Sequence, residues 1–393
     1  MSDTPKKAVI GYAIVGLDYI GNDDAEYIEG SSGVIIRDMD WTASMRQTFE
    51  YYTVDPSTWK DVSRIENVID SSINWDSSAD TLGSATINIC DSLPECYIRI
   101  YLITVQNGVR RKHPLGTFLV QTPSFKFDGK TKNISLDAYT PLLELKENHP
   151  PIGYSIAKGT NILEITTRLV REQARAPIYQ VDSTDTLYSN FVSSPNDTWI
   201  VFLKDLLMNA GKKGYRFGLD ELGRIIFLPN QDVKSLQPVW TYTDDNSSIL
   251  YPSLDMDHDL YGIPNVVEVV YSEGAKCFYG IAVNDDPSSP TSTVNRGRKI
   301  THRVVNPGLP GIPNQAQIEQ YAQQTLRDMS TLEYTVTYTH GYCPVRIGDC
   351  VRLNYKKAGI YGVKAKVISQ TINCTPGCPV TEKATFTSSL WKG

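Results

Sequence analysis

The stretch from Cys96 to Tyr139, CYIRIYLITVQNGVRRKHPLGTFLVQTPSFKFDGKTKNISLDAY, shows the pattern that dominates the chain. It holds at least four predicted strands, rich in β-branched and aromatic residues and separated by turn residues. The pairs Asn107-Gly108 and Asp128-Gly129 are hairpin signals, because their residues tolerate the positive φ of a tight turn. We therefore expect consecutive antiparallel strands, as in a sandwich or small barrel.

The composition is that of a large globular protein. The chain has 393 residues, which is too long for one ordinary core, so two to four domains are expected. Tyr is unusually common, with 23 residues against 10 Phe, which suits half-exposed pleated surfaces. No run of eighteen apolar residues occurs, and the apolar part of the N-terminal segment is short, so we expect neither a membrane span nor a signal peptide.

Charge and cysteine content narrow the function classes. The net charge of −6 argues against a basic nucleic-acid-binding surface, although DNA could still pass an acidic wall without binding to it. Seven cysteines are an odd number scattered over a long chain. That suits thiols kept reduced during cytoplasmic assembly better than a secreted disulfide framework.

Shifts in composition predict four segments. Residues 1–49 mix short alternating runs with Gly, Asp and Ser and are interpreted as an N-terminal arm or extension. Residues 50–147 form a first β domain, which ends where His149 precedes two prolines that neither a strand nor a helix can include. Residues 148–252 form a small α/β domain, and residues 253–393 a second β domain.

A helix is predicted after Thr160 or Asn161, either of which can cap it, and it ends before Pro177. Its apolar residues recur at helical spacing. A second helix runs from a cap at Asn196 or Asp197, carries one apolar stripe and ends near Gly211. A hairpin follows at residues 215–229, which completes the α/β character of this segment.

The last third contains one more helix, at residues 314–330, with a capping-box-like start at Asn314 and Gln317. Its predicted apolar face holds Ile318, Tyr321, Ala322, Thr325, Leu326 and Met329. The segment LEYTVTYTH then alternates strictly, with Tyr334, Val336 and Tyr338 on one side of a strand. Residues 284–299 are predicted to be a polar loop without periodicity.

The acidic run DMDHD, Asp255 to Asp259, is the most metal-like cluster. A calcium loop needs Gly at its sixth position and a bidentate Glu at its twelfth, but these positions hold Leu260 and Val266. We therefore interpret the run as a solvated loop before a strand, and no metal site is predicted there.

The cysteines near the C-terminus pose a second question. Cys374 and Cys378 flank a Pro-Gly turn, and with Cys343 and Cys350 they would supply four thiolates for zinc. The six-residue gap between Cys343 and Cys350 does not fit a zinc knuckle. Free thiols are the preferred interpretation, and a zinc site or a disulfide between Cys374 and Cys378 stays open.

The stretch CPVRIGDCVRLNY is interpreted as a corner between strands. Gly348 bends the backbone, and the side chain of Asp349 can bond to the amides of the turn. Histidines occur at five unrelated positions, and no metalloprotease, nucleophile-elbow, Walker or dinucleotide-binding motif is present. Paired acidic residues for glycoside cleavage stay open. We expect no enzyme, catalytic residue or cofactor, and NRGRK, Asn295 to Lys299, is interpreted as a solvated loop tip.

The order of these parts resembles the baseplate hub (tail hub) proteins of tailed phages and phage-like contractile particles. The resemblance rests on YYTVDPSTWKDVSRIENV, GSATINI, PLGTFLVQTP and LDAYTPLLEL, then on FLKDLLMNAGKKGYRFGLDELGRIIFLP, NVVEVVY and VRIGDCVRL. It covers roughly residues 45 to 393. It implies a mainly β chain, in which two antiparallel β-barrel domains flank the small α/β domain, and a trimeric ring.

The resemblance also implies a function. Such a homotrimer adapts the sixfold tail tube to a threefold central spike, nucleates tube assembly and forms the conduit for the genome. Its expected partners are a tail tube or distal tail protein, a central spike protein and a tape-measure protein, in a virion assembled in the host cytoplasm. Two alternatives stay open: the central tail-tip protein of a non-contractile tail, and a host-surface carbohydrate-binding β protein.

Overall fold

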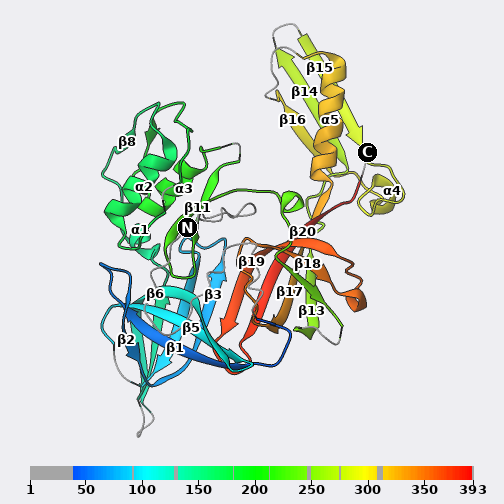
Figure 1. The fold of residues 1–393 in the computed structure, drawn as a ribbon. Helices are drawn as coiled ribbons and strands as arrows, with labels where there is room; N and C mark the ends of the chain where they lie inside the picture. Colours follow the sequence, from blue (N-terminus) through cyan, green and yellow to red (C-terminus); the bar gives the residue numbers. More distant parts are fainter. Residues whose placement is uncertain are drawn as a thin grey trace, which may run out of the picture. The chain divides into compact units, whose positions relative to one another are not determined.

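A computed structural model describes residues 39–391, apart from residues 91–92, 128–131, 180, 212, 246–248, 274–275 and 308–312. The chain is mainly β, as predicted (Figure 1). Its contacts divide it into two compact units: residues up to Leu254 with Tyr338–Ala384, and Asp255–Thr337 with Thr385 onward. The arm predicted at residues 1–49 lies mostly outside the described residues, and the last part of it, from Arg46, belongs to the first strand.

The first β region contains seven antiparallel strands. They are β1 (Arg46–Val54), β2 (Asp61–Ile65), β3 (Val68–Asp76), β4 (Gly83–Ile89), β5 (Tyr97–Gln106), β6 (Val109–Phe127) and β7 (Lys132–Tyr139). Eight consecutive residues of β5 are buried, so both of its faces are covered. This strand forms the centre of the region's core.

Asn107 and Gly108 have φ angles of 51° and 80° and form the tight turn between β5 and β6, as predicted. The second signal, Asp128-Gly129, lies outside the described residues. The prediction of at least four strands between Cys96 and Tyr139 is wrong, because β6 is a single strand of 19 residues. A register shift in each of its two pairings lets it bend and keep both partners.

One sheet joins the two β-rich regions of the sequence. Strand β3 pairs antiparallel with β19 (Val363–Asn373), where Ile73 lies opposite Ile372. In the described part of the chain the sheet has 13 strands, in the order β13-β17-β20-β19-β3-β4-β7-β6-β5-β1-β2, with β18 beside β19 and β12 beside β18. The further strands are β12 (Trp240–Thr243), β13 (Leu250–His258), β17 (Thr331–Gly341), β18 (Cys350–Asn354) and β20 (Pro379–Ser389).

This path corrects the expectation of two closed barrels. Among the described residues the sheet is open: its path ends at β2 and at β13, and β12 is a further edge strand that pairs only with β18. The edge of β3 that closure of the first region would use is paired with β19 instead. Edge strands are the weak point of any sheet, and here the chain covers the edge of β3 by joining its own β regions.

The middle segment is a helical insert between these β regions. It contains α1 (Leu143–Glu147), α2 (Ile162–Gln173), α3 (Trp199–Leu207), a short 3₁₀ turn at Val233–Ser235 and two hairpins, β8 (Ser155–Ile156) with β9 (Phe191–Val192) and β10 (Tyr215–Leu219) with β11 (Ile225–Pro229). The Asn161 side chain accepts a hydrogen bond from the Glu164 amide and caps α2, as predicted. The cap of α3 is Thr198 and not Asn196 or Asp197. Asp197 instead accepts a hydrogen bond from the Ser194 amide of the preceding turn.

The second unit contains a three-stranded sheet with one helix packed on it. Its strands are β14 (Val266–Glu273), β15 (Lys276–Val283) and β16 (Thr301–Val305), and its helices are α4 (Thr293–Arg296) and α5 (Gln315–Met329). The capping box between Asn314 and Gln317 is confirmed. Ile318, Ala322 and Leu326 are buried against the sheet, so the predicted apolar stripe of α5 is confirmed as well.

No helix among the described residues has both the length and the apolarity that crossing a membrane requires.

Candidate interaction site

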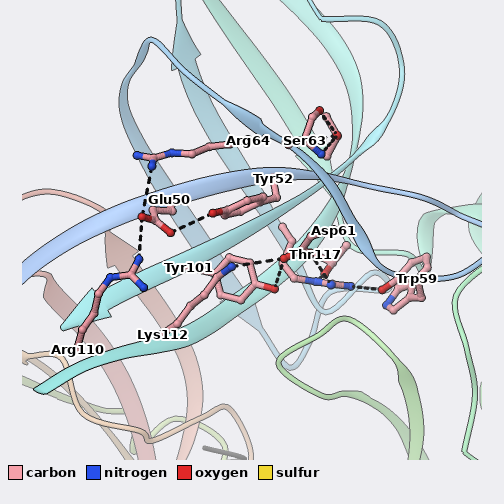
Figure 2. A network of polar contacts seen from close by, with 12 residues as sticks. Glu50, Tyr52, Trp59, Asp61, Ser63, Arg64, Tyr101, Arg110, Lys112 and Thr117 are labelled. Carbon is pink, nitrogen blue, oxygen red and sulfur yellow. Dashed lines mark hydrogen bonds and ion pairs between the residues drawn. The ribbon is translucent and has the colours of Figure 1, made fainter. Parts of the chain in front are cut away.

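A network of polar side chains in the first β region lies on one face of the sheet formed by β1, β2, β5 and β6 (Figure 2). Side chains alternate between the faces of a strand, so Glu50 and Tyr52 of β1 point to the same side. Cross-strand pairing brings Glu50 opposite Tyr101 and Tyr52 opposite Arg64. The register of β1 with β2 and with β5 therefore brings the side chains of this network together.

A bulge brings Asp61 into this network. The β1–β2 register shifts between Thr53 and Val54, which places Asp61 opposite Val54. The Asp61 carboxylate accepts hydrogen bonds from Arg99 Nη1 at 2.8 Å and from the Tyr101 hydroxyl at 2.7 Å. Without the bulge, the carboxylate would face the opposite side of the sheet.

Arg99 is the buried centre of the network. Its Nε donates to Thr117 Oγ1 at 2.9 Å, and its Nη2 donates to the carbonyls of Trp59 and Leu222, each at 3.2 Å. The carbonyl of Leu222 also accepts from Trp59 Nε1 and from Thr117 Oγ1, each at 2.8 Å. Leu222 lies in the turn between β10 and β11, so these donors fix the helical insert to the first β region.

Lys112 lies between two tyrosine rings. Its Nζ is 4.0 Å from the ring centre of Tyr52, 3.8 Å from that of Tyr101 and 3.6 Å from Asp61 Oδ2. Burial lowers the pKa of Lys112, and Asp61 and Glu50 oppose that shift. Burial also raises the pKa of the Tyr101 hydroxyl. The rings and the carboxylate together hold the ammonium group in place.

Glu50 forms the outer half of the network. Its carboxylate lies 3.5 Å from Arg64 and 3.0 Å from Arg110, and it accepts a hydrogen bond from the Tyr52 hydroxyl at 3.2 Å. Both Glu50 and Asp61 are therefore occupied by cations and hydroxyls of the chain. A site of this kind suits electrostatic contact with a partner better than acid–base chemistry, which needs a carboxylate or base free to exchange protons.

A second polar cluster is fully buried near the C-terminal end. Nε2 of His340 lies 3.3 Å from the Glu382 carboxylate, and neither side chain is exposed. Glu382 also accepts hydrogen bonds from the hydroxyls of Tyr338, at 2.7 Å, and Tyr242, at 3.2 Å, and from the Gln370 amide. The cluster ties β12, β17, β19 and β20 together.

Within this cluster, His340 and Glu382 form an ion pair. Burial alone would lower the pKa of His340, but the charges and hydrogen bonds of Glu382 and Cys343 raise it well above its usual value. Burial alone would raise the pKa of Glu382, but His340 and donors including Gln370 lower it. Nδ1 of His340 donates to the Gly341 carbonyl at 2.6 Å, which leaves the Nε2 proton for Glu382. Because neither side chain is exposed and both bond to neighbouring strands, we assign the pair a structural role.

The RIGD turn forms the corner that the sequence predicts. Gly348 has a φ of 92°, and the Asp349 carboxylate accepts a hydrogen bond from the Arg346 amide at 2.9 Å. Burial raises the pKa of Asp349 to about 6, against the opposing charge of Arg346. The Arg346 side chain forms an ion pair with Glu221, and the Arg216 guanidinium lies directly against Gly348. The turn therefore contacts the β10–β11 hairpin of the insert.

A cavity of about 100 Å³ lies beside this turn. Its apolar lining includes Trp75, Leu115, Ile226 and Ile372, and Asp349 is among its polar residues. This volume accommodates a few water molecules and is smaller than the roughly 300–1,000 Å³ of typical ligand pockets. We assign no ligand to it.

The described residues form neither the zinc site nor the disulfide that the sequence left open for the C-terminal cysteines. All seven cysteines are unbonded, and Cys343, Cys350, Cys374 and Cys378 are buried. Burial raises the pKa of Cys374 to about 12 and also raises that of Cys378. Among the described residues, no three His, Cys, Asp or Glu side chains lie where they could hold a metal ion. Such buried neutral thiols are poor nucleophiles and poor ligands.

The acidic loop and the polar loop predicted from the sequence both differ from expectation. Asp255–His258 belongs to β13, so the acidic run is mostly strand and not loop, although its side chains are exposed. The segment 284–299 contains the short helix α4. Its Asn284 and Thr291 are fully buried, so polar side chains form the interior of this segment. Arg296 donates to the carbonyls of Ile263 and Leu260 and holds this segment against the strand region before β14.

The sequence reasoning missed Arg99 and Glu382, the centres of both clusters. The available signal was a charged residue at a position whose neighbours are all of buried type, as in YIRIYLI for Arg99. Buried charges are rare unless paired, so such positions indicate a partner elsewhere in the chain. The sequence does not say which partner it is.

No family model and no curated protein match this sequence. Solved structures do share its fold. A tail protein from Neisseria meningitidis MC58 superposes with a TM-score of 0.57 at 13% identity, over 87% of this chain and 97% of that one. The 43 kDa tail protein of prophage MuSo2 from Shewanella oneidensis gives 0.54 at 11% identity, over 86% and 98%.

A third likeness is to a chain of the Francisella PdpA–VgrG complex, with a TM-score of 0.51 at 8% identity. It covers 88% of this chain and 53% of that one, so this chain spans about half the length of that protein. At these identities the likeness is one of fold.

Proposed function

We propose that this chain is a structural protein of a phage-type tail, and specifically its baseplate hub. The observation that carries this proposal is the extent of the fold likeness: the two tail proteins are covered over 97% and 98% of their length. The likeness therefore takes in the β regions, the helical insert and the second unit together. A shared domain alone would cover much less.

The occupied network and the buried ion pair support a structural role. Both clusters use their charges to join strands and the insert, and their carboxylates and cations bond to each other. A hub must transmit assembly and ejection forces through a fixed shape, which such cross-links favour. We accordingly propose that the protein is not an enzyme and requires no cofactor.

In the proposed assembly, three copies form a ring in which each copy contributes two β-rich regions. The ring matches the sixfold tail tube on one side and the threefold central spike on the other, with a conduit for DNA and the tape-measure protein. The net charge of −6 suits a channel through which DNA passes without binding. The partners are a tail tube or distal tail protein, the central spike and the tape-measure protein, and the location is the virion.

Electron microscopy of the purified protein, alone and mixed with the tail tube protein of the same genome, tests this function. The proposal expects threefold rings that cap one end of tubes and shorten the lag of tube assembly. Tubes that assemble at the same rate and carry no cap would overturn the hub role. If the rings cap tubes but the gene cluster encodes no sheath or wedge protein, the chain is instead the central tail-tip protein of a non-contractile tail.

A further inference from the structure

In the outer part of the network, Arg64 and Arg110 are more exposed than the Glu50 and Asp61 carboxylates that they and the inner cations contact. The side chains of Glu50 and Asp61 are 12% and 22% exposed, whereas those of Arg64 and Arg110 are 49% and 45% exposed. Arg46 is also exposed and shares this face, because β1 alternates from Arg46 to Glu50. We call the surface formed by Arg46, Arg64 and Arg110 the basic face.

The arginines of the basic face retain binding capacity. Arg64 and Arg110 approach the same oxygen of Glu50 from different strands, which places their guanidinium groups side by side. A guanidinium has five N–H donors. Glu50 engages one nitrogen of each arginine and Glu66 engages Nε of Arg64, which together occupy only a fraction of the ten donors that the pair carries. The two groups can therefore bind further carboxylates from the solvent side.

The same chain carries unpartnered acidic residues on another strand. Asp255 and Asp257 lie two positions apart in β13, so they share one side of the strand at a spacing of roughly 7 Å. Both are exposed. Across the described residues, neither carboxylate has a hydrogen-bond or ion-pair partner. We call Asp255 and Asp257 the acidic strand.

Each of the two surfaces includes an edge strand. Arg64 belongs to β2, and β2 and β13 are the ends of the path through the 13-stranded sheet. Each end strand exposes backbone N–H and C=O groups that no described strand pairs. Complementary charge and open backbone therefore occur together at both ends.

Building on the proposed homotrimer, we propose that the basic face of one copy binds the acidic strand of the next copy. The contact joins two different surfaces, so every copy offers both halves and the interaction repeats until a ring closes. Charge pairs at the rim of such a contact set its register and exclude wrong partners. This assigns the subunit interface to Arg64 and Arg110 on one side and to Asp255 and Asp257 on the other.

A nucleic acid fits the basic face less well than a protein carboxylate does. Glu50 and Glu66 stand among the cations, within 3.5 Å of Arg64, and repel a continuous run of phosphates. The rings of Tyr52 and Tyr101 are covered by Lys112 and are not available for stacking on bases. Single carboxylates can bind the arginines between Glu50 and Glu66, whereas the continuous phosphate backbone of a nucleic acid would be repelled by both glutamates.

Charge exchange on the full-length protein tests the proposal. The first variant is Arg64→Glu with Arg110→Glu, the second is Asp255→Lys with Asp257→Lys, and the third carries all four changes. Sedimentation velocity across a dilution series measures the self-association of each. We expect the first two variants to associate at least about tenfold more weakly than the natural protein and the fourfold variant to recover, because its charges are complementary again.

Two controls separate this effect from misfolding. Arg168→Glu with Arg171→Glu makes the same change in net charge on exposed positions of α2 and should leave association unchanged. Near-UV circular dichroism checks the fold. The Asp255 and Asp257 variant is the less disruptive of the two, because these side chains lose no hydrogen bond or ion pair with any described residue. Raising the salt from about 0.1 M to about 1 M, which shortens the Debye length from about 10 Å to about 3 Å, should weaken association of the natural protein.

The outcomes also distinguish this interface from the proposed function. If the natural protein forms trimers and both charge-reversed variants do so equally well, the interface is elsewhere and the hub proposal stands. If the fourfold variant fails to recover although it is folded, the pairing of these two surfaces is overturned. If the natural protein remains monomeric at all concentrations, the interface and the self-assembling hub are both overturned.

Discussion

Nη2 of Arg99 lies 3.2 Å from the carbonyl oxygen of Leu222, although the two residues are 123 positions apart in the sequence. This bond belongs to a group in which Trp59 and Thr117 donate to the same carbonyl. The β10–β11 turn is thus held by donors from three separate places in the first β region. The position of the helical insert depends on this anchor.

Replacing Arg99 should destabilise the larger unit. Arg99→Met leaves the Asp61 carboxylate without its buried partner and should cost about 3 kcal/mol of unfolding free energy, in the range for breaking a buried pair. Denaturant unfolding measures this cost, with Arg110→Met as a control at an exposed pair that should cost less than about 1 kcal/mol. Additive effects of Arg99→Met and Asp61→Asn in a double-mutant cycle would show that the pair does not contribute.

The His340–Glu382 pair should make stability depend on pH in a defined direction. The pKa of His340 is raised in the folded state, so its contribution is complete below about pH 6.5 and declines as the pH rises toward the folded value. The pKa of Glu382 is lowered, so its contribution is present above about pH 4.5 and is lost on acidification. Both contributions are complete between these two values.

Glu382→Gln checks this dependence. We expect it to cost about 3 kcal/mol near pH 5.5 and progressively less at alkaline pH, where the pair is weaker in the natural protein as well. Unfolding in a series of buffers measures the difference, and the exposed Glu333→Gln serves as the control. A loss that is constant from pH 5 to pH 9 would contradict the ion-pair assignment.

Sequence reasoning recovered the local features of this fold and missed the long-range ones. The Asn107-Gly108 turn, the capping box of α5 and the RIGD corner follow from residues that lie within a few positions of each other. The pairing of β3 with β19 does not, although Thr371 bonds to Asn74 across 297 positions. Any strand edge of suitable length could have supplied that partner, so two closed barrels were expected where one open sheet is found.

The same limit applies to the candidate site. The alternation of β1 predicts that Glu50 and Tyr52 share a face, but the partners on that face depend on the register with β2 and β5. The bulge that turns Asp61 toward Arg99 has no signal in the sequence KDVSRI. Register and bulges arise from packing over the whole sheet, which local patterns do not specify.

Gly280 should be indispensable for the packing of α5. A Cβ atom at this position would lie 2.7 Å from the backbone oxygen of Ile318, and backbone cannot move aside as a side chain can. Gly280→Ala should therefore destabilise the second unit by about 1–3 kcal/mol. Hydrogen exchange of the α5 amides measures this. Gly341→Ala, whose Cβ would meet only Ile249 at 3.8 Å, is the control, and equal protection in both variants would contradict the prediction.

Six of the seven cysteines should divide into two classes of reactivity, with the half-buried Cys96 between them. Cys90 and Cys277 are exposed, whereas Cys343, Cys350, Cys374 and Cys378 are buried. Under native conditions, a thiol reagent should modify Cys90 and Cys277 within minutes and the buried four only on unfolding. Peptide mapping by mass spectrometry identifies the modified residues. Rapid native labelling of Cys374 or Cys378 would show that the C-terminal sheet opens more readily than its burial indicates.

The proposal of a self-assembling tail hub is tested most directly by the solution mass of the purified protein. Light scattering across a wide dilution series gives that mass without assumptions about shape. The account predicts a particle of three times 43.9 kDa that persists on tenfold dilution from micromolar concentration. A mass of 43.9 kDa at every concentration would contradict it.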